Sequence, residues 1–130
     1  MQTANSIQLT AKYFRFEKLE VWQLSRVFVG SIYKITMQFP REEMFGLISQ
    51  LRRAAISLVL NIAEGADRRS DTDFRRFLRM AQTSLEEVVS GLYIALDQNF
   101  IHQTEFETLY TEAHIIACKI NAFINRLSGR

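Results

Sequence analysis

The side chains that could bind a metal ion are few in this chain, and their spacing does not suit a metal site. A di-iron site in a helical bundle needs Glu-x-x-His on two helices and a further carboxylate on each of the other two. Glu112 and His114 are two residues apart, so they point in different directions on a helix, and His102 falls near a predicted loop. We therefore predict no metal site and no cofactor.

The sequence does not indicate nucleophilic catalysis either. Cys118, the only cysteine, lies within an apolar helical pattern, where thiols are usually buried and inert. The 5 glycines form neither a phosphate-cradling loop nor a Gly-x-Ser-x-Gly turn. Glu86 and Glu87 are adjacent and diverge on a helix, so they cannot act as an acid and base pair. We predict no catalytic residues and a protein that is not an enzyme.

Arginines gather around the predicted turn between the second and third helices, and they are the candidates for nucleic-acid contact. The planar guanidinium donates two parallel hydrogen bonds to a phosphate, which suits this group to a nucleic-acid backbone. Four carboxylates are interleaved with them, at Glu64, Asp67, Asp71 and Asp73. Two interpretations stay open: a basic patch that binds phosphates, or pairs within the molecule that neutralise it. The candidate arginines are Arg52, Arg53, Arg68, Arg69, Arg75, Arg76 and Arg79.

A line of polar side chains runs along one side of the predicted second helix. Steps of three or four residues place its members on one face, namely Gln50, Arg53, Ser57, Asn61 and Glu64. Thr83, Glu87 and Ser90 have similar spacing on the third helix. Small polar residues weaken a long helix locally, so we expect a network between helices or subunits in which Arg53 meets Glu64 or Glu87. A polar groove that meets a ligand is the alternative.

Composition indicates a globular helical protein rather than a disordered or membrane-spanning one. Hydrophobic residues make up 48% and charged residues 23%, with 1 proline and 5 glycines. No apolar run approaches the roughly 20 residues of a membrane span, and residues 1–10 lack the apolar core of a signal peptide. We expect a soluble protein of the cytoplasm. Its charge is uneven, because residues 80–130 hold three Lys or Arg against six acids while residues 1–40 are basic.

Apolar residues recur every three or four positions in four segments, which predicts an all-α fold. The segments run over about 16–37, 41–65, 70–96 and 104–127. Because the connections are short, sequential helices should be antiparallel neighbours in an up-down-up-down four-helix bundle. The spacing in the last segment is typical of left-handed packing. We predict a flexible segment over 1–15 and one bundle domain over 16–128.

The predicted helix ends depend on a few residues of special conformation. Pro40 and the acids after it should start the second helix, and Gly65 should end it in a left-handed conformation. Ser70 and Thr104, each with an acid three residues later, resemble capping boxes of the third and fourth helices. Asn99 lies in the polar break between them and can adopt a positive φ.

The middle of the second helix is apolar almost all round, which is more than one core-facing stripe requires. Left exposed, these side chains would form a larger apolar patch than monomers usually carry. We therefore predict that copies of the chain associate and cover it. The apolar residues are Ala54, Ala55, Ile56, Leu58, Val59, Leu60, Ile62 and Ala63.

Three separated motifs carry a resemblance to a known family. The first is Phe-Glu-Lys-Leu-Glu-Val-Trp at 16–22. The second is Gln-Leu-Arg-Arg-Ala-Ala at 50–55, followed by Ser57 and by Asn-Ile-Ala-Glu-Gly at 61–65. The third is Phe-Arg-Arg-Phe-Leu-Arg-Met-Ala at 74–81, followed by Ser84 and Glu87. The chain resembles the four-helix-bundle proteins encoded in intervening sequences of bacterial 23S rRNA genes, also labelled S23 ribosomal protein, which include accessory proteins of diversity-generating retroelements.

This resemblance implies a homopentameric barrel with a central channel and no enzymatic activity. For the retroelement members it implies binding of RNA and of a reverse transcriptase, which would make RNA or a nucleic-acid-processing protein the partner besides the chain itself. The seven arginines then become the nucleic-acid candidates. The residues that the resemblance marks as a structural signature are Gln50, Ser57, Asn61, Glu64, Gly65, Ser84 and Glu87. A purely structural or protein-binding bundle is the alternative function.

Overall fold

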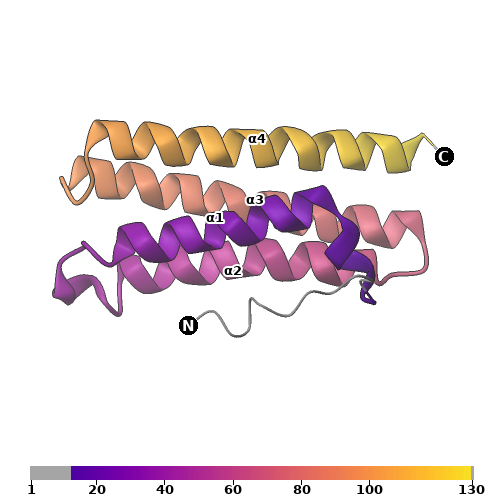
Figure 1. Cartoon of the computed structure of the whole chain (residues 1–130), viewed down its shortest axis with the longest axis horizontal. Coiled ribbons are helices and arrows are strands. Elements are labelled where there is room, and N and C mark those ends of the chain that lie inside the picture. The colour runs from indigo at the N-terminus through magenta and orange to yellow at the C-terminus, as the bar shows by residue number, and fades with distance from the viewer. Residues whose placement is uncertain (1–12, 130) are drawn as a thin grey trace.

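The computed structural model describes residues 13–129, which form four long antiparallel helices (Figure 1). No strand occurs in this described part, so the predicted all-α, four-helix architecture is confirmed. Most of the predicted flexible segment, residues 1–12, lies outside the described residues, and a 3-10 helix, η2 (Arg15–Lys18), precedes the first long helix. The long helices are α1 (Glu20–Thr36), α2 (Leu47–Ala66), α3 (Asp71–Asp97) and α4 (Gln103–Ser128).

The second helix begins later than its sequence pattern predicts. Pro40 is followed by a short 3-10 helix, η3 (Arg41–Glu43), and the α-helix starts only at Leu47. The Glu43 carboxylate accepts a 3.1 Å hydrogen bond from the Leu47 backbone N–H. It satisfies one of the N–H groups that the start of a helix leaves without a partner. Glu43 thus caps α2 from outside and does not form its first turn.

The prediction of a left-handed cap at Gly65 is wrong. None of the described glycines has a positive φ, and α2 continues through Gly65 to Ala66. At the start of α3, Ser70 Oγ accepts a 3.1 Å hydrogen bond from the Asp73 N–H, as a cap should. The reciprocal half of that capping box is replaced, because the Asp73 carboxylate binds Arg76.

In the turn from α3 to α4, the prediction for Asn99 is confirmed, whereas the predicted start of α4 is wrong. Asn99 has φ 63°, the left-handed conformation expected of it. The fourth helix begins at Gln103, ahead of the expected cap at Thr104. Its start is fixed by Glu105, whose carboxylate accepts a 2.8 Å hydrogen bond from the His102 N–H.

The core lies along the axis of the bundle, where each helix contributes a buried apolar stripe. Each helix packs against its neighbours in the order α1, α2, α3, α4 and back to α1, and the α2 and α3 pair has the most extensive contact. Helices α2 and α4 lie diagonally across the bundle, with no Cα atoms within 8 Å of each other, and meet only through the shared core. None of the helices in the described part is long and apolar enough to cross a membrane.

Candidate nucleic-acid and subunit interfaces

Three of the signature residues form a hydrogen-bond network between α2 and α3. The hydroxyl oxygens of Ser57 and Ser84 are 2.9 Å apart. Asn61 Nδ2 donates to the Ser57 carbonyl oxygen at 2.9 Å and to the Ser57 hydroxyl at 3.1 Å. Ser84 is buried, while Ser57 and Asn61 are half-buried. The expected network between the helices is therefore present, and it consists of small hydroxyl and amide groups rather than charges.

The charged members of the polar line are not part of this network. Glu64 pairs at 2.9 Å with Arg68, which lies in the turn just after α2. Arg53 and Glu87 are both exposed, and neither has an ion pair among the described residues. The predicted pairing of Arg53 with Glu64 or Glu87 is thus not formed within one chain. Gln50 is exposed as well, at the start of the line.

Gly65 lets α2 and α3 approach each other closely. A Cβ atom at this position would lie 2.9 Å from Phe74 Cδ1 and 2.9 Å from Phe77 Cβ, which is closer than real contacts allow. The helix end needs a residue without a side chain because two aromatic residues of α3 occupy the space. The signature glycine is therefore required by packing and not by its backbone conformation.

Four of the seven candidate arginines are held by groups of the same chain. Arg52 Nε donates to Thr36 Oγ1 at 2.9 Å, and its guanidinium lies over the Tyr33 ring. Arg75 donates to the Leu127 carbonyl at 3.1 Å, which ties α3 to the end of α4.

Arg68 and Arg76 are held around the Phe77 ring, at 4.5 and 4.6 Å from its centre. Arg68 also pairs with Glu64 at 2.9 Å, and Arg76 with Asp73 at 2.9 Å. These contacts offset the positive charge at the turn between α2 and α3 and reduce what is left for phosphates.

Arg53, Arg69 and Arg79 are exposed, and their guanidinium groups have no hydrogen-bond or ion-pair partner among the described residues. They do not form one compact patch. Because Ser57 lies opposite Ser84, Arg53 and Arg79 lie on opposite sides of that contact, four and five residues away. At 1.5 Å per residue they are about 14 Å apart along the bundle. One chain therefore offers scattered guanidinium groups.

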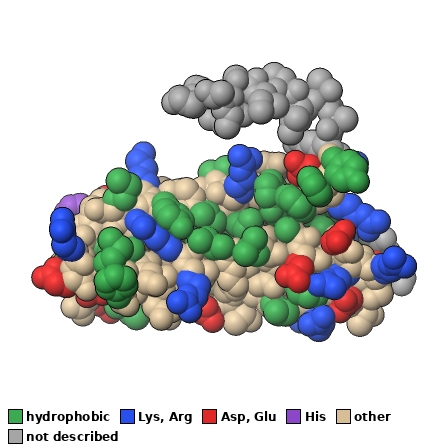
Figure 2. All heavy atoms as spheres, turned by 90° about the horizontal axis from the view of Figure 1, so that it is seen from below, with side chains coloured by type: hydrophobic (Ala, Val, Ile, Leu, Met, Phe, Trp, Pro, Cys, Tyr) green, Lys and Arg blue, Asp and Glu red, His purple; other side chains and the backbone are tan. Residues whose placement is uncertain are grey.

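Helix α2 leaves an apolar band on the outside of the protein. Of the apolar residues predicted to need cover, Ala54, Ala55, Leu58 and Ile62 are buried within the chain. Ile56 and Leu60 remain 37% and 59% exposed. Figure 2 shows hydrophobic side chains gathered along this face of the molecule. We call these residues the α2 band: Phe14, Met44, Phe45, Ile56, Val59, Leu60 and Ala63.

Both ends of the α2 band are hollowed. Met44 and Phe45 share a hollow with Ile56, and Phe14 shares another with Leu60 and Ala63. Phe45 is 97% exposed, although an aromatic ring gains much from burial. Neither Phe45 nor Phe14 was among the apolar residues that the sequence predicted to need cover. Their position beside the break at Pro40 and before the first motif was the available signal.

Cys118 of α4 does not lie where the sequence predicted it. Cys118 is exposed, with its sulfur 3.6 Å from His114 Nε2, so the prediction of a buried thiol is wrong. The buried stripe runs through Ile116 and Ile120, and the residue midway between them points to the opposite side. Within residues 13–129, no group of three His, Cys, Asp or Glu side chains is placed to hold a metal ion.

Comparison with known families bears on these motifs directly. A sequence model of the 23S rRNA-intervening sequence proteins matches residues 17–122, which include all of α1, α2 and α3 and most of α4. The chain belongs to the family of 23S rRNA-intervening sequence proteins. The resemblance seen in the three motifs is thereby confirmed, and the signature residues lie within the matched region.

A solved relative shows the same fold. It is a protein of unknown function from the S23 ribosomal protein family of Bacteroides thetaiotaomicron VPI-5482, which is 22% identical in sequence and superposes with a TM-score of 0.72. The match covers 80% of this chain and 97% of that one. No curated protein matches the chain. The family membership therefore fixes the fold and leaves the activity to be argued from the surfaces.

Proposed function

We propose that the protein is a cytoplasmic, non-catalytic binding module that assembles into a closed ring and holds structured RNA or a nucleic-acid-processing protein such as a reverse transcriptase. The observation that carries the proposal is the α2 band, with Phe45, Ile56 and Leu60 exposed on one face. A binding surface of this kind is the default explanation of a contiguous exposed apolar patch.

Assembly into a ring would cover the α2 band in every copy. A contact between two different surfaces of one chain repeats around a rotation axis, and closure leaves no copy with an exposed surface. Five copies are the number that the family resemblance implies. The polar residues Arg53 and Glu87, which have no ion pair among residues 13–129, would also gain the opportunity to pair across a subunit contact.

Binding of RNA would depend on the exposed arginines. The guanidinium groups of Arg69 and Arg79 are exposed and have no partner in the part of the chain that the structure describes, so each can bind a phosphate through paired hydrogen bonds. One chain offers too few for tight binding, whereas a ring repeats each group in every copy. The family name refers to intervening sequences of 23S rRNA, so structured RNA is the first partner to test.

A second candidate function is a protein-binding ring without affinity for nucleic acid. It is favoured by the arginines that the chain itself holds, since Arg68 and Arg76 pair with carboxylates and Arg75 binds a backbone carbonyl. Under this alternative the turn between α2 and α3 is a structural element only.

Two measurements separate these functions. Light scattering at micromolar concentration should give a mass several times the 15.1 kDa of one chain, and a monomeric mass would exclude the ring. Filter binding of a folded 23S rRNA fragment should then show an affinity that falls steeply with salt, because bound phosphates release counterions. An oligomer that binds the fragment at no salt concentration, or without a salt dependence, would favour the protein-binding ring.

A further inference from the structure

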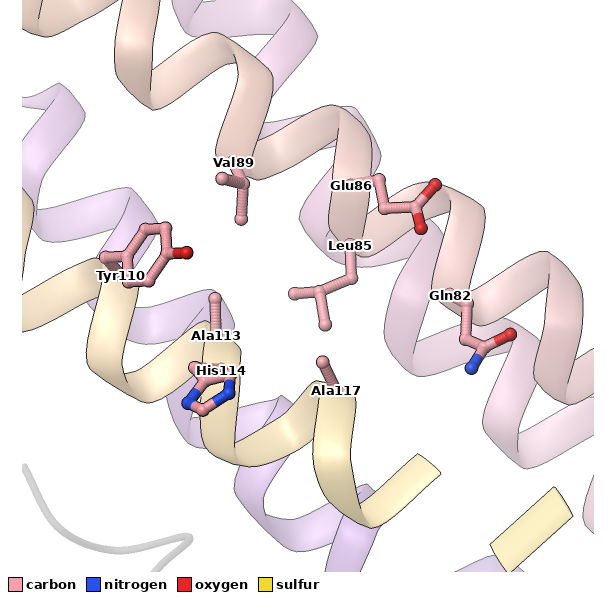
Figure 3. A pocket seen from close by; sticks show the side chains of 8 residues that line it. All are labelled: Gln82, Leu85, Glu86, Val89, Tyr110, Ala113, His114 and Ala117. Carbon is pink, nitrogen blue, oxygen red and sulfur yellow. The ribbon is translucent and has the colours of Figure 1, made fainter. Parts of the chain in front are cut away.

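A hollow of about 250 Å³ lies between α3 and α4 on the outside of the bundle. Figure 3 shows Leu85 and Val89 of α3 and Ala113 and Ala117 of α4 pointing into it, with Tyr110 at one end. Gln82, Glu86 and His114 line its edges. We call this site the α3/α4 groove.

The groove exists because small residues lie between larger aromatic spacers. Tyr93 and Phe106 are packed with ring centres 4.7 Å apart toward one end of the helix pair, and Phe74 and Phe123 at 5.0 Å toward the other. Between them, Ala113 and Ala117, one turn apart on α4, are too short to fill the space, so Val89 stays half-buried above a floor that includes the buried Leu85. The groove therefore has room for two apolar side chains that are one turn apart on another helix.

The α2 band of a second copy has the matching side chains. Ile56 and Leu60 are four residues apart, both exposed, and lie on one face of α2 together with Arg53. Arg53 has no partner among the described residues. The groove edge offers Glu86, an exposed carboxylate that has no ion pair in the described part either. Shape and charge thus complement each other across the two surfaces.

The two surfaces also lie at the same height along the bundle. Ser57 is opposite Ser84, so Leu85 of the groove lies level with Ile56. Ala113 and Ala117 share the groove with Leu85 and are therefore level with the same part of α2. Rotation about an axis parallel to the helices changes no height, so a ring of copies brings equal heights together. Since α2 and α4 lie diagonally across the bundle, the outer face of α2 meets the α3/α4 groove of a second copy and not that of its own chain.

We infer that the α2 band of one copy docks in the α3/α4 groove of the next, with Ile56 and Leu60 in the groove and Arg53 beside Glu86. The inference rests on the proposed ring and names its two contact surfaces. Arg53 then serves the subunit contact, which leaves Arg69 and Arg79 for nucleic acid.

Charge exchange tests the ion pair. Arg53→Glu and Glu86→Arg should each raise the protein concentration at which half of the assembly dissociates at least tenfold, because like charges then face each other. Light scattering over a dilution series measures this concentration. The double variant R53E/E86R should recover most of the affinity between copies. Circular dichroism checks that each variant folds, which is expected because both side chains are exposed. If the double variant is as dissociated as the single ones, this pairing is wrong.

Groove filling and crosslinking test the docking itself. Ala117→Trp should dissociate the assembly, whereas Ala122→Trp, at an exposed position of α4 outside the groove, should not. In a Cys118→Ser background, oxidation of L60C/A117C should give covalent multimers, while either single cysteine should not. An assembly that persists in A117W and gives no multimers would show that another surface covers the α2 band. A wild-type monomer would overturn the proposed ring together with this inference.

Discussion

Ser57 and Ser84 place their hydroxyl oxygens 2.9 Å apart where α2 packs against α3. Asn61 donates to the same Ser57 hydroxyl, so three polar groups satisfy one another at the largest helix interface of the bundle. The contact fixes the register of the two helices, because a hydroxyl pair cannot slide by a turn without leaving a buried oxygen unpaired. The heights of all other residues on the two helices follow from it.

Replacement of Ser84 by Ala should lower the free energy of unfolding by about 1 kcal/mol, since Ser57 loses a partner at a half-buried site. Ser57→Ala should cost a similar amount and also remove one of the two acceptors of Asn61, whose bond to the Ser57 carbonyl remains. The double variant S57A/S84A should cost clearly less than the two single variants together, because the partners disappear jointly. Urea unfolding of the four proteins measures this. Additive effects would mean that the two hydroxyl groups do not interact.

Replacement of Gly65 by Ala should destabilise the protein by about 1–3 kcal/mol, because the new methyl group would overlap Phe74 and Phe77. Gly30→Ala is the matched control. Gly30 lies inside α1, and a Cβ there would meet nothing within 4 Å. This variant should gain about 0.5–1 kcal/mol, as expected for a helix interior. Thermal unfolding of both variants checks the contrast, and equal effects would contradict a packing role for Gly65.

The number and order of the helices could be predicted from periodicity, because each helix buries one stripe of three- and four-residue spacing. Ser70 and Asn99 were equally readable, since their roles depend on the local chain alone. The start of α2 was not, because Glu43 reaches forward across a 3-10 turn to cap Leu47. The spacing of apolar residues does not predict this hydrogen bond between a side chain before the helix and the backbone of its first residue.

The candidate sites were predicted less well than the helices for a related reason. Whether Arg68 is free or paired depends on the rotamers and on the exact turn that brings Glu64 and Phe77 to it. The α3/α4 groove depends on the register in which α3 packs against α4. The residue spacing within each helix does not determine that register. Cys118 is the exception, because the stripe through Ile116 and Ile120 already places it outside.

Replacement of Leu60 by Asp should lower the mass of the assembly while the single chain keeps its fold. Leu60 is 59% exposed in one chain, so the carboxylate meets water there and loses it only in the subunit contact. Ile115→Asp on α4 is the matched control, with 45% exposure and no place in the α2 band. Light scattering with circular dichroism distinguishes the two. A mass unchanged by L60D would exclude the α2 band as a subunit contact.

Replacement of Arg69 and Arg79 by Ala should weaken binding of folded RNA without affecting stability, because neither guanidinium has a partner in the described chain. The slope of log affinity against log salt should become shallower by about 0.7–0.9 for each phosphate that is no longer bound. Arg75→Ala gives the opposite result: RNA affinity stays, while removal of the hydrogen bond to the Leu127 carbonyl destabilises the end of α4. Filter binding should therefore detect a change only in R69A/R79A, and urea unfolding should detect a change only in R75A. If R69A/R79A binds RNA as tightly and with the same salt slope as the unmodified protein, its free arginines do not contact phosphate.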